Sequence, residues 1–167
     1  GNYDPDATQD DGSCSGYPDN GDYSLLFGAN KSVDVGDVLN QTAYTKTAWI
    51  KKQTGGGYNN IFSGGNYHAH GVPSERSYKL CAGHNYLWYT VEDSAPIVSD
   101  EWVFVSVTYD PDVDSGTMKL YKNGDLVDSA TGVAVQDISS TSYIGRFAGA
   151  YNFYGLIDSV TFWHRAL

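Results

Sequence analysis

Short runs in which apolar and polar residues alternate recur along the chain, and this period of two predicts β-strands. Residues 101–110 show the alternation most clearly. One row of this run consists of Val103, Val105, Val107 and Tyr109. Because successive side chains of a strand point to opposite faces, we expect this row to face the core.

Residues 42–52 alternate in the same way. They predict a second strand, with one face toward the core and the other toward solvent or a ligand. From their positions in these two patterns, Trp49 and Trp102 are expected to be core residues. The pattern leaves the environments of Trp88 and Trp163 open.

Turn residues separate the predicted strands. The pair Asn123-Gly124 lies between two alternating runs and is typical of a type I′ β-hairpin. The last thirteen residues, 155–167, are also predicted to form a strand, and a terminal strand is ordered only when it pairs within a sheet. The chain holds about eleven such strands and no long helical pattern, which predicts an all-β fold, a two-sheet antiparallel β-sandwich or jelly roll.

The composition agrees with a single domain. The chain has 167 residues, with 19 Gly, 14 Tyr and one Met. This length can bury a core without metals or many disulfides. No run of 18 apolar residues is present, so we expect a soluble protein with no membrane insertion.

Acidic residues are concentrated at the start of the chain. Of the net charge of −10, six units come from aspartates in residues 1–22, which contain no Lys or Arg. The negative balance argues against nucleic acid or an anionic membrane as the partner, because Lys and Arg supply phosphate contacts. We therefore divide the chain into an acidic leader, residues 1–22, and a sandwich domain, residues 23–167.

The leader is rich in Asp, Gly and Pro and has no apolar run, as expected of a linker. Its spacing of carboxylates before Gly12 is similar to that of a calcium loop, although the Gly and Glu of an EF-hand are missing. A solvated acidic linker is the alternative. The candidate calcium ligands are Asp4, Asp6, Asp10 and Asp11.

The chain has two cysteines, Cys14 and Cys81. A disulfide between them would tie the leader to the domain and stabilise the fold by roughly 4 kcal/mol through chain entropy. Two free thiols are the alternative, and the sequence does not decide between them.

Five pieces of residues 23–167, in order, resemble laminin-G-like domains of the concanavalin A-like superfamily. These domains show a Trp-centred strand, a strand that begins with Trp and ends in Tyr-Asp, a Tyr-x-Asn-Gly hairpin, and a Gly-x-Ile-Asp strand that ends in Arg-Ala-Leu. The matching pieces are TAYTKTAWIKK, EWVFVSVTYD, YKNGDLV, SYIG and YGLIDSVTFWHRAL. The leader resembles short Asp-rich, Cys-flanked repeats of secreted bacterial surface proteins.

The resemblance implies a curved two-sheet sandwich, often with one structural Ca²⁺, in a secreted or cell-surface protein. Asp158 lies among apolar neighbours, where a charge needs a partner. It would act either as a calcium ligand, near Asn30 or Asp34, or as an acceptor for backbone N–H groups. Members of this family bind glycans, bind proteins or serve as adhesion modules.

The sequence lacks the patterns of hydrolytic enzymes. A Glu-x-Asp-x-x-Glu strand, which places two carboxylates on one face in related glycosidases, is absent, as is a Gly-x-Ser-x-Gly elbow. The acids of Glu92-Asp93 and Asp100-Glu101 bracket a Pro-containing segment and are interpreted as solvated turn residues. We therefore predict a protein without catalytic activity.

Aromatic and polar residues are mixed in two loop regions, as expected of a glycan site, because sugars stack their C–H faces on aromatic rings and hydrogen-bond through their hydroxyls. Residues 64–79 are predicted to be a long loop, in which His68 and His70 have a metal-like spacing but are interpreted as sugar contacts with Arg76. The predicted ligand-binding residues are Tyr58, Asn60, Tyr67, His68, His70 and Arg76, and, in the second region, Arg146, Tyr151, Asn152 and Tyr154.

Together these features predict a lectin-like module that binds a polysaccharide or glycan and is stabilised by Ca²⁺. Neighbouring domains of a longer parent protein are further expected partners. The alternative function is a structural or adhesive module that binds proteins, within a large surface protein or a virus-like particle.

Overall fold

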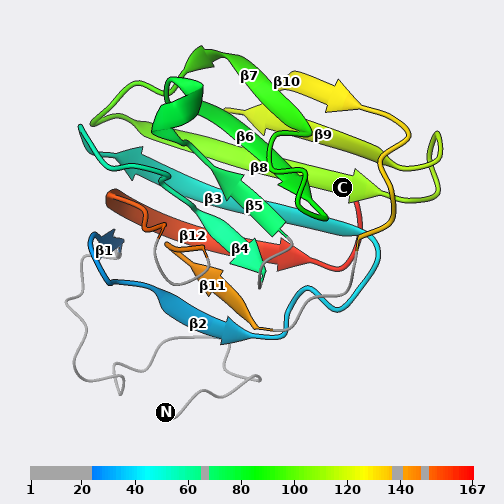
Figure 1. Cartoon of the computed structure of the whole chain (residues 1–167), viewed down its shortest axis with the longest axis horizontal. Helices are drawn as coiled ribbons and strands as arrows, with labels where there is room; N and C mark the ends of the chain where they lie inside the picture. The colour runs from blue at the N-terminus through cyan, green and yellow to red at the C-terminus, as the bar shows by residue number, and fades with distance from the viewer. Residues whose placement is uncertain (1–23, 65–67, 137–140, 148–150) are drawn as a thin grey trace, which may run out of the picture.

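The computed structural model describes residues 24–64, 68–136, 141–147 and 151–167. These residues form twelve strands and one short 3₁₀ helix, arranged in two antiparallel six-stranded sheets. The predicted all-β, two-sheet sandwich is therefore confirmed. Figure 1 shows the sheets as two stacked layers, with strand β3 behind strands β4 and β5. Among the described residues there is no helix long and apolar enough to cross a membrane.

The first sheet contains the closing strand and the two strands with the clearest alternation. Its order is β1 (Leu25–Phe27), β12 (Gly155–Trp163), β3 (Tyr44–Lys52), β8 (Trp102–Asp110), β9 (Thr117–Lys122) and β10 (Asp125–Ala130).

The second sheet contains the shorter strands. Its order is β2 (Val33–Gly36), β11 (Ser142–Ile144), β4 (Phe62–Gly64), β5 (His68–Gly71), β6 (Lys79–His84) and β7 (Val91–Pro96). The 3₁₀ helix η1 (Ser74–Arg76) connects β5 to β6.

The core lies between the sheets, and the predicted row on β8 contributes to it: Val103, Val105, Val107 and Tyr109 are all buried. Leu80 and Ala82 of β6 reach this core from the second sheet.

The prediction that Trp49 and Trp102 are core residues is wrong. They are 41% and 40% exposed. The buried positions of β3 include Ala48 and Ile50, so Trp49, between them, points outward. The strand alternates as predicted, but the row that contains Trp49 faces outward.

The Asn123-Gly124 hairpin is confirmed. It joins β9 to β10, with Asp125 paired to Lys122, and both turn residues have positive φ, 53° at Asn123 and 89° at Gly124. Positive φ at both central residues is the signature of a type I′ turn.

The closing strand β12 pairs with β1 on one side and β3 on the other, and it ends at Trp163. Its register with β3 shifts after Asp158, where Ser159 has a φ of 47°. The Asp158 carboxylate accepts hydrogen bonds from Ser159 N at 2.5 Å and Ser159 Oγ at 3.2 Å. Asp158 is thus an acceptor for its neighbour within the bulge.

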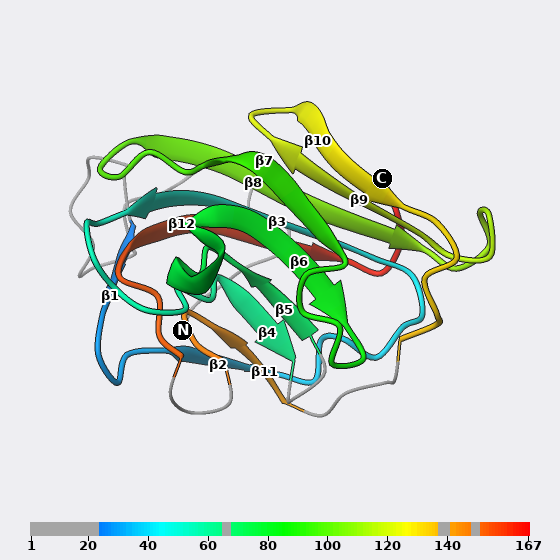
Figure 2. The same ribbon diagram turned by 45° about the horizontal axis from the view of Figure 1, so that its top comes forward.

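The two sheets meet along one edge, where β7 and β10 lie side by side in both views (Figures 1 and 2). Glu92 N donates to Asp128 Oδ2 at 2.7 Å, and Asp93 forms an ion pair with Lys122. The prediction that Glu92 and Asp93 are solvated turn residues is therefore wrong. They belong to β7, and Asp93 is only 3% exposed.

Candidate functional site

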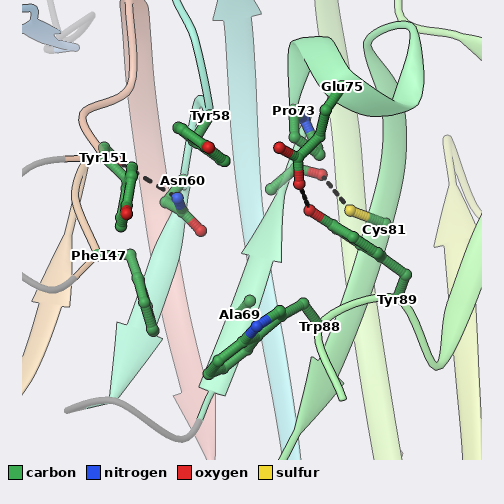
Figure 3. Close-up of a pocket in the computed structure, with 11 residues that line it drawn as sticks. Tyr58, Asn60, Ala69, Pro73, Glu75, Cys81, Trp88, Tyr89, Phe147 and Tyr151 are labelled. Carbon is green, nitrogen blue, oxygen red and sulfur yellow. Dashed lines mark hydrogen bonds between the residues drawn. The ribbon is translucent and has the colours of Figure 1, made fainter. Parts of the chain in front are cut away.

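A pocket of about 340 Å³ lies on the outer face of the second sheet, where the segments that carry Tyr58, Trp88 and Tyr151 converge (Figure 3). Five of its lining residues are aromatic, and only one carries a formal charge. The pocket is lined by Tyr58, Asn60, Ala69, Gly71, Pro73, Glu75, Cys81, Trp88, Tyr89, Phe147 and Tyr151.

The floor of the pocket consists of small residues on β5 and β6. Leu80 and Ala82 face the core, so Cys81 between them faces outward, and Ala69 and Gly71 line the pocket beside it. At Gly71 a Cβ atom would lie 3.0 Å from a neighbouring backbone oxygen. Small side chains at these outward positions leave the volume that the pocket occupies.

One wall combines residues from the two regions that the sequence predicted as separate. The rings of Tyr58 and Tyr151 meet with centroids 4.2 Å apart, and Phe147 stacks on Tyr151 at 5.9 Å. Asn60 Nδ2 donates to Tyr151 O at 3.2 Å and so links the two loops. The two predicted regions therefore form one site.

A buried asparagine fixes the loop that carries Tyr58. Asn59 has a φ of 43° and is completely buried. Its Oδ1 accepts a hydrogen bond from Tyr154 N at 3.1 Å, which attaches residues 56–60 to the segment that precedes β12. Asn59 therefore positions the wall that carries Tyr58 without itself lining the pocket.

The opposite wall comes from the turn between β6 and β7. Asn85 and Tyr86 adopt positive φ, 53° and 65°, and the turn carries Trp88 and Tyr89. The Trp88 ring contacts the Phe147 ring with centroids 5.0 Å apart, so the two walls touch at one end of the pocket. The sequence pattern left the environment of Trp88 open, and Trp88, Tyr89 and Phe147 were absent from the predicted site.

Glu75 supplies the carboxylate of the pocket. It lies on η1 and accepts a hydrogen bond from the Tyr89 hydroxyl (Figure 3). The negative charge of Glu75 raises the pKa of the exposed Tyr58. Glu75 was also absent from the predicted site, because a single Glu in a polar segment carries no distinguishing sequence signal.

Arg76 borders the pocket but is held by another carboxylate. Its Nε pairs with Glu92, and its guanidinium lies 5.1 Å from the centre of the Tyr89 ring. Lys79 Nζ lies 3.3 Å from the other oxygen of Glu92. The hydrogen bond from Arg76 lowers the pKa of Glu92, so this carboxyl is ionised and paired.

Three predicted ligand-binding residues, Tyr58, Asn60 and Tyr151, are thus brought together in the pocket. Tyr67 lies outside the described residues. Arg146 packs over the Tyr143 ring at 3.9 Å, and Asn152 is buried. With Tyr154, these two lie near the pocket segments without lining the pocket.

The prediction of a long loop over residues 64–79 is wrong in part, because residues 68–71 form β5. His68 and His70 point into the core and are 0% and 1% exposed. They are therefore not part of the pocket. Their neighbour Lys46 is equally buried, with its Nζ 3.2 Å from His68 Nδ1.

Burial dominates the chemistry of this inner cluster. It lowers the pKa of Lys46 to about 7, and, together with the charge of Lys46, it lowers the pKa of His70 to about 3. The pKa of His68 is also lowered well below its usual value, mainly by burial. Within the described part of the chain, His70 Nε2 has no hydrogen-bond partner.

The calcium site stays a prediction. Asp4, Asp6, Asp10 and Asp11 lie outside the described residues. Asn30 and Asp34 are exposed, and Asp34 Oδ1 accepts from Gly36 N at 2.9 Å. Among the described residues there is no group of three or more His, Cys, Asp or Glu side chains that could hold a metal ion.

Cys81 is a free, buried thiol, and its Sγ lies 3.5 Å from Gly71 O. Burial, with the charge of Glu92, raises the pKa of Cys81 to about 12. The thiolate form is therefore scarce at neutral pH, and Cys81 acts as a small apolar side chain in the floor. Cys14 lies outside the described residues.

The predicted resemblance to laminin-G-like domains is confirmed. The family model of the concanavalin A-like lectin/glucanases superfamily matches residues 27–167, and the chain belongs to this superfamily. No curated protein matches the chain.

Solved structures share the fold at low sequence identity. The CBM40 domain of the Ruminococcus gnavus IT-sialidase has a TM-score of 0.73 at 15% identity, covering 87% of this chain and 92% of that domain. It has also been solved with α2,3-sialyllactose bound. Domain 4 of AbnA, an extracellular arabinanase of Geobacillus stearothermophilus in complex with arabinotriose, has a TM-score of 0.60 at 20% identity, covering 79% of this chain and 65% of that chain. These similarities show the fold.

Proposed function

We propose that the chain is a carbohydrate-binding module without catalytic activity and that the pocket on the second sheet is its binding site. The observation that carries this proposal is the pocket itself, in which five aromatic side chains surround Asn60 and Glu75. Sugars need this combination, because their C–H faces stack on rings while their hydroxyls need polar partners.

The volume of the pocket and the solvent exposure of its wall suit a saccharide. Pockets for small ligands usually begin at about 300 Å³, and this one has about 340 Å³. Tyr58 is 41% exposed, so its ring is accessible from solvent. The rings of Trp88 and Phe147 hold each other edge to face, which limits the entropy lost when a ligand stacks on them.

The carboxylates near the pocket support a binding role over hydrolysis. Glycoside hydrolysis by the usual mechanism needs two carboxyl groups on either side of the scissile bond. Among the described residues that line the pocket, Glu75 is the single carboxylate. The nearby Glu92 is held by Arg76 and Lys79, and its lowered pKa does not suit a general acid.

The solved structures support the same proposal from another direction. Two of them have sialyllactose or arabinotriose bound, on the fold that this chain shares. The arabinanase is described as extracellular. We accordingly propose a secreted or cell-surface location and a glycan as the partner.

Affinity electrophoresis through gels that contain soluble polysaccharides tests the proposal. We expect the protein to be retarded by at least one polysaccharide, and Trp88→Ala to lose the retardation, because stacking on the pocket wall is removed. The matched control is Trp163→Ala, which removes an indole that is 41% exposed at the end of β12. Thermal melting shows whether both variants are folded.

Equal loss of retardation in both variants would contradict the proposed site. Absence of retardation by every polysaccharide, together with binding to a protein partner, would favour the alternative adhesive function.

A further inference from the structure

The polar groups of the pocket are arranged to accept hydrogen bonds. Asn60 uses its Nδ2 group to donate to Tyr151 O, which leaves its Oδ1 on the pocket side of the amide (Figure 3). A side-chain amide has one acceptor oxygen and an NH₂ group with two N–H donors, and here the NH₂ group is directed at Tyr151 O. Asn60 therefore presents an acceptor to a ligand.

Glu75 presents further acceptors. An ionised carboxylate accepts at two oxygens and donates from neither. The Tyr89 hydroxyl donates to Oε1, and this contact holds the carboxylate on the pocket side of η1. The remaining lone pairs of Glu75 suit ligand hydroxyl groups, which are donors. Hydrogen bonds to a charged acceptor are stronger than those between neutral groups.

No cation balances Glu75 inside the pocket. The lining of the described pocket contains neither Lys nor Arg. Arg76, the neighbour of Glu75 in the sequence, and Lys79 both pair with Glu92. The whole chain carries a net charge of −10. A carboxylate on a ligand would therefore meet the like charge of Glu75, while Arg76, which borders the pocket, is already paired with Glu92.

We propose that the pocket selects neutral glycans, whose hydroxyls donate to Glu75 and Asn60, and rejects glycans that place a sialic or uronic acid in the pocket. This inference rests on the proposed function. It separates the chain from the domain of the same fold that has been solved with sialyllactose bound. Fold is shared between the two proteins, and the charge of the pocket sets the ligand class.

A set of matched oligosaccharide pairs tests the selection. Each pair contains a neutral glycan and its acidic counterpart, such as lactose with α2,3-sialyllactose and xylotetraose with its glucuronic acid derivative, and arabinotriose is added as a further neutral probe. Binding is measured by isothermal titration calorimetry. In each pair that binds, we expect the affinity for the neutral glycan to be at least about tenfold higher than the affinity for its acidic counterpart. An acidic glycan that binds more tightly than its neutral counterpart would overturn the inference and leave the proposed function intact.

Glu75→Gln tests the carboxylate directly. It keeps the shape of the side chain, removes the charge and replaces one acceptor with a donor. We expect it to weaken the neutral ligand on the order of tenfold or more and to reduce the discrimination against the acidic counterpart. The matched control, Glu101→Gln, changes an exposed carboxylate outside the pocket and should change neither.

The two proposals fail in different ways. If Glu75→Gln binds as the parent does while Trp88→Ala loses binding, the inference is wrong and the proposed function stands. If the parent protein binds none of the neutral and acidic probes and is retarded by no polysaccharide, both are wrong.

Discussion

The two faces of the strand pair β5–β6 differ in chemistry although they share one backbone. The inward face carries His68 and His70, buried beside Lys46. The outward face carries Ala69 and Cys81 in the floor of the aromatic pocket. Ionisable groups are thus placed where solvent is excluded, and small uncharged residues line the site that a ligand can reach.

The nature of a side chain therefore does not by itself identify a functional site. Histidines are common functional residues, but these two lie where ionisation is unfavourable, so their role concerns stability. The small residues on the outward face contribute to the candidate site because they leave the volume that the pocket occupies.

The largest expected effect is acid destabilisation through the inward face. His70 takes up a proton near pH 6.5 in the unfolded chain but near pH 3 in the folded one. The unfolded state binds more protons between these values, so stability falls as the pH is lowered through this window. By pH 4 the loss from His70 should reach about 3 kcal/mol. Urea unfolding at pH 4 to 7 measures it.

His70→Gln serves as the control for this prediction, because glutamine does not titrate. We expect a lower stability at pH 7 but a shallower dependence on pH. An unchanged pH dependence in the variant would show that His70 is not the group responsible.

Two alanines on opposite faces offer a matched comparison. Ala69→Phe fills the pocket, and we expect saccharide affinity to fall on the order of a hundredfold, about 3 kcal/mol, with little change in melting temperature. Ala82→Phe overpacks the core, where Ala82 is 1% exposed, and should cost about 3 kcal/mol of folding stability while the folded fraction still binds. Calorimetric titration and urea unfolding of both variants measure the two effects. If Ala69→Phe instead lowers the folding stability, or the folded Ala82→Phe protein loses saccharide affinity, the assignment of the two faces is wrong.

A smaller effect is expected on the alkaline side. Burial lowers the pKa of Lys46 from 10.5 to about 7, so between these values the unfolded chain binds a proton that the folded chain has released. Stability should therefore rise by about 2 kcal/mol from pH 7 to pH 9. Urea unfolding at the two pH values tests this, and Lys46→Met should remove most of the increase. A free energy of unfolding that falls from pH 7 to pH 9 in the unsubstituted protein, but not in Lys46→Met, would contradict the lowered pKa of Lys46.

The smallest effect concerns the predicted calcium ion. If Asp158, Asn30 or the acidic leader binds Ca²⁺, adding it to metal-free protein should raise the melting temperature by about 3 °C, or about 1 kcal/mol. Mg²⁺ at the same concentration is the control for ionic strength. A melting temperature that does not change when Ca²⁺ is added would contradict the predicted calcium site.

The sequence predicted those features that depend on local patterns. Alternation located the β8 strand and the buried row that includes Val105, and the pair Asn123-Gly124 located its hairpin. Mixed aromatic and polar loops indicated Tyr58 and Tyr151. In each of these cases the signal lies within a few neighbouring residues.

Features that depend on long-range pairing were missed. His70 lies in a polar segment, and it is buried because its neighbours pair with β6 across the sheet. Trp88 joins the pocket because the turn after β6 brings it against Phe147, 59 residues later. Trp49 was misplaced because the alternating pattern of its strand does not show which of the two rows faces the core. Parity follows from the register, which one strand alone does not determine.

Chemical-shift mapping by ¹H–¹⁵N NMR is the most direct test of the claim that a saccharide binds at the outward face of β5–β6. We predict that titration with an oligosaccharide that the protein binds shifts the amide signals of Ala69, Gly71 and Cys81 and the indole signal of Trp88. Shifts concentrated instead at Trp49 and Trp102, on the outer face of the first sheet, would contradict the claim.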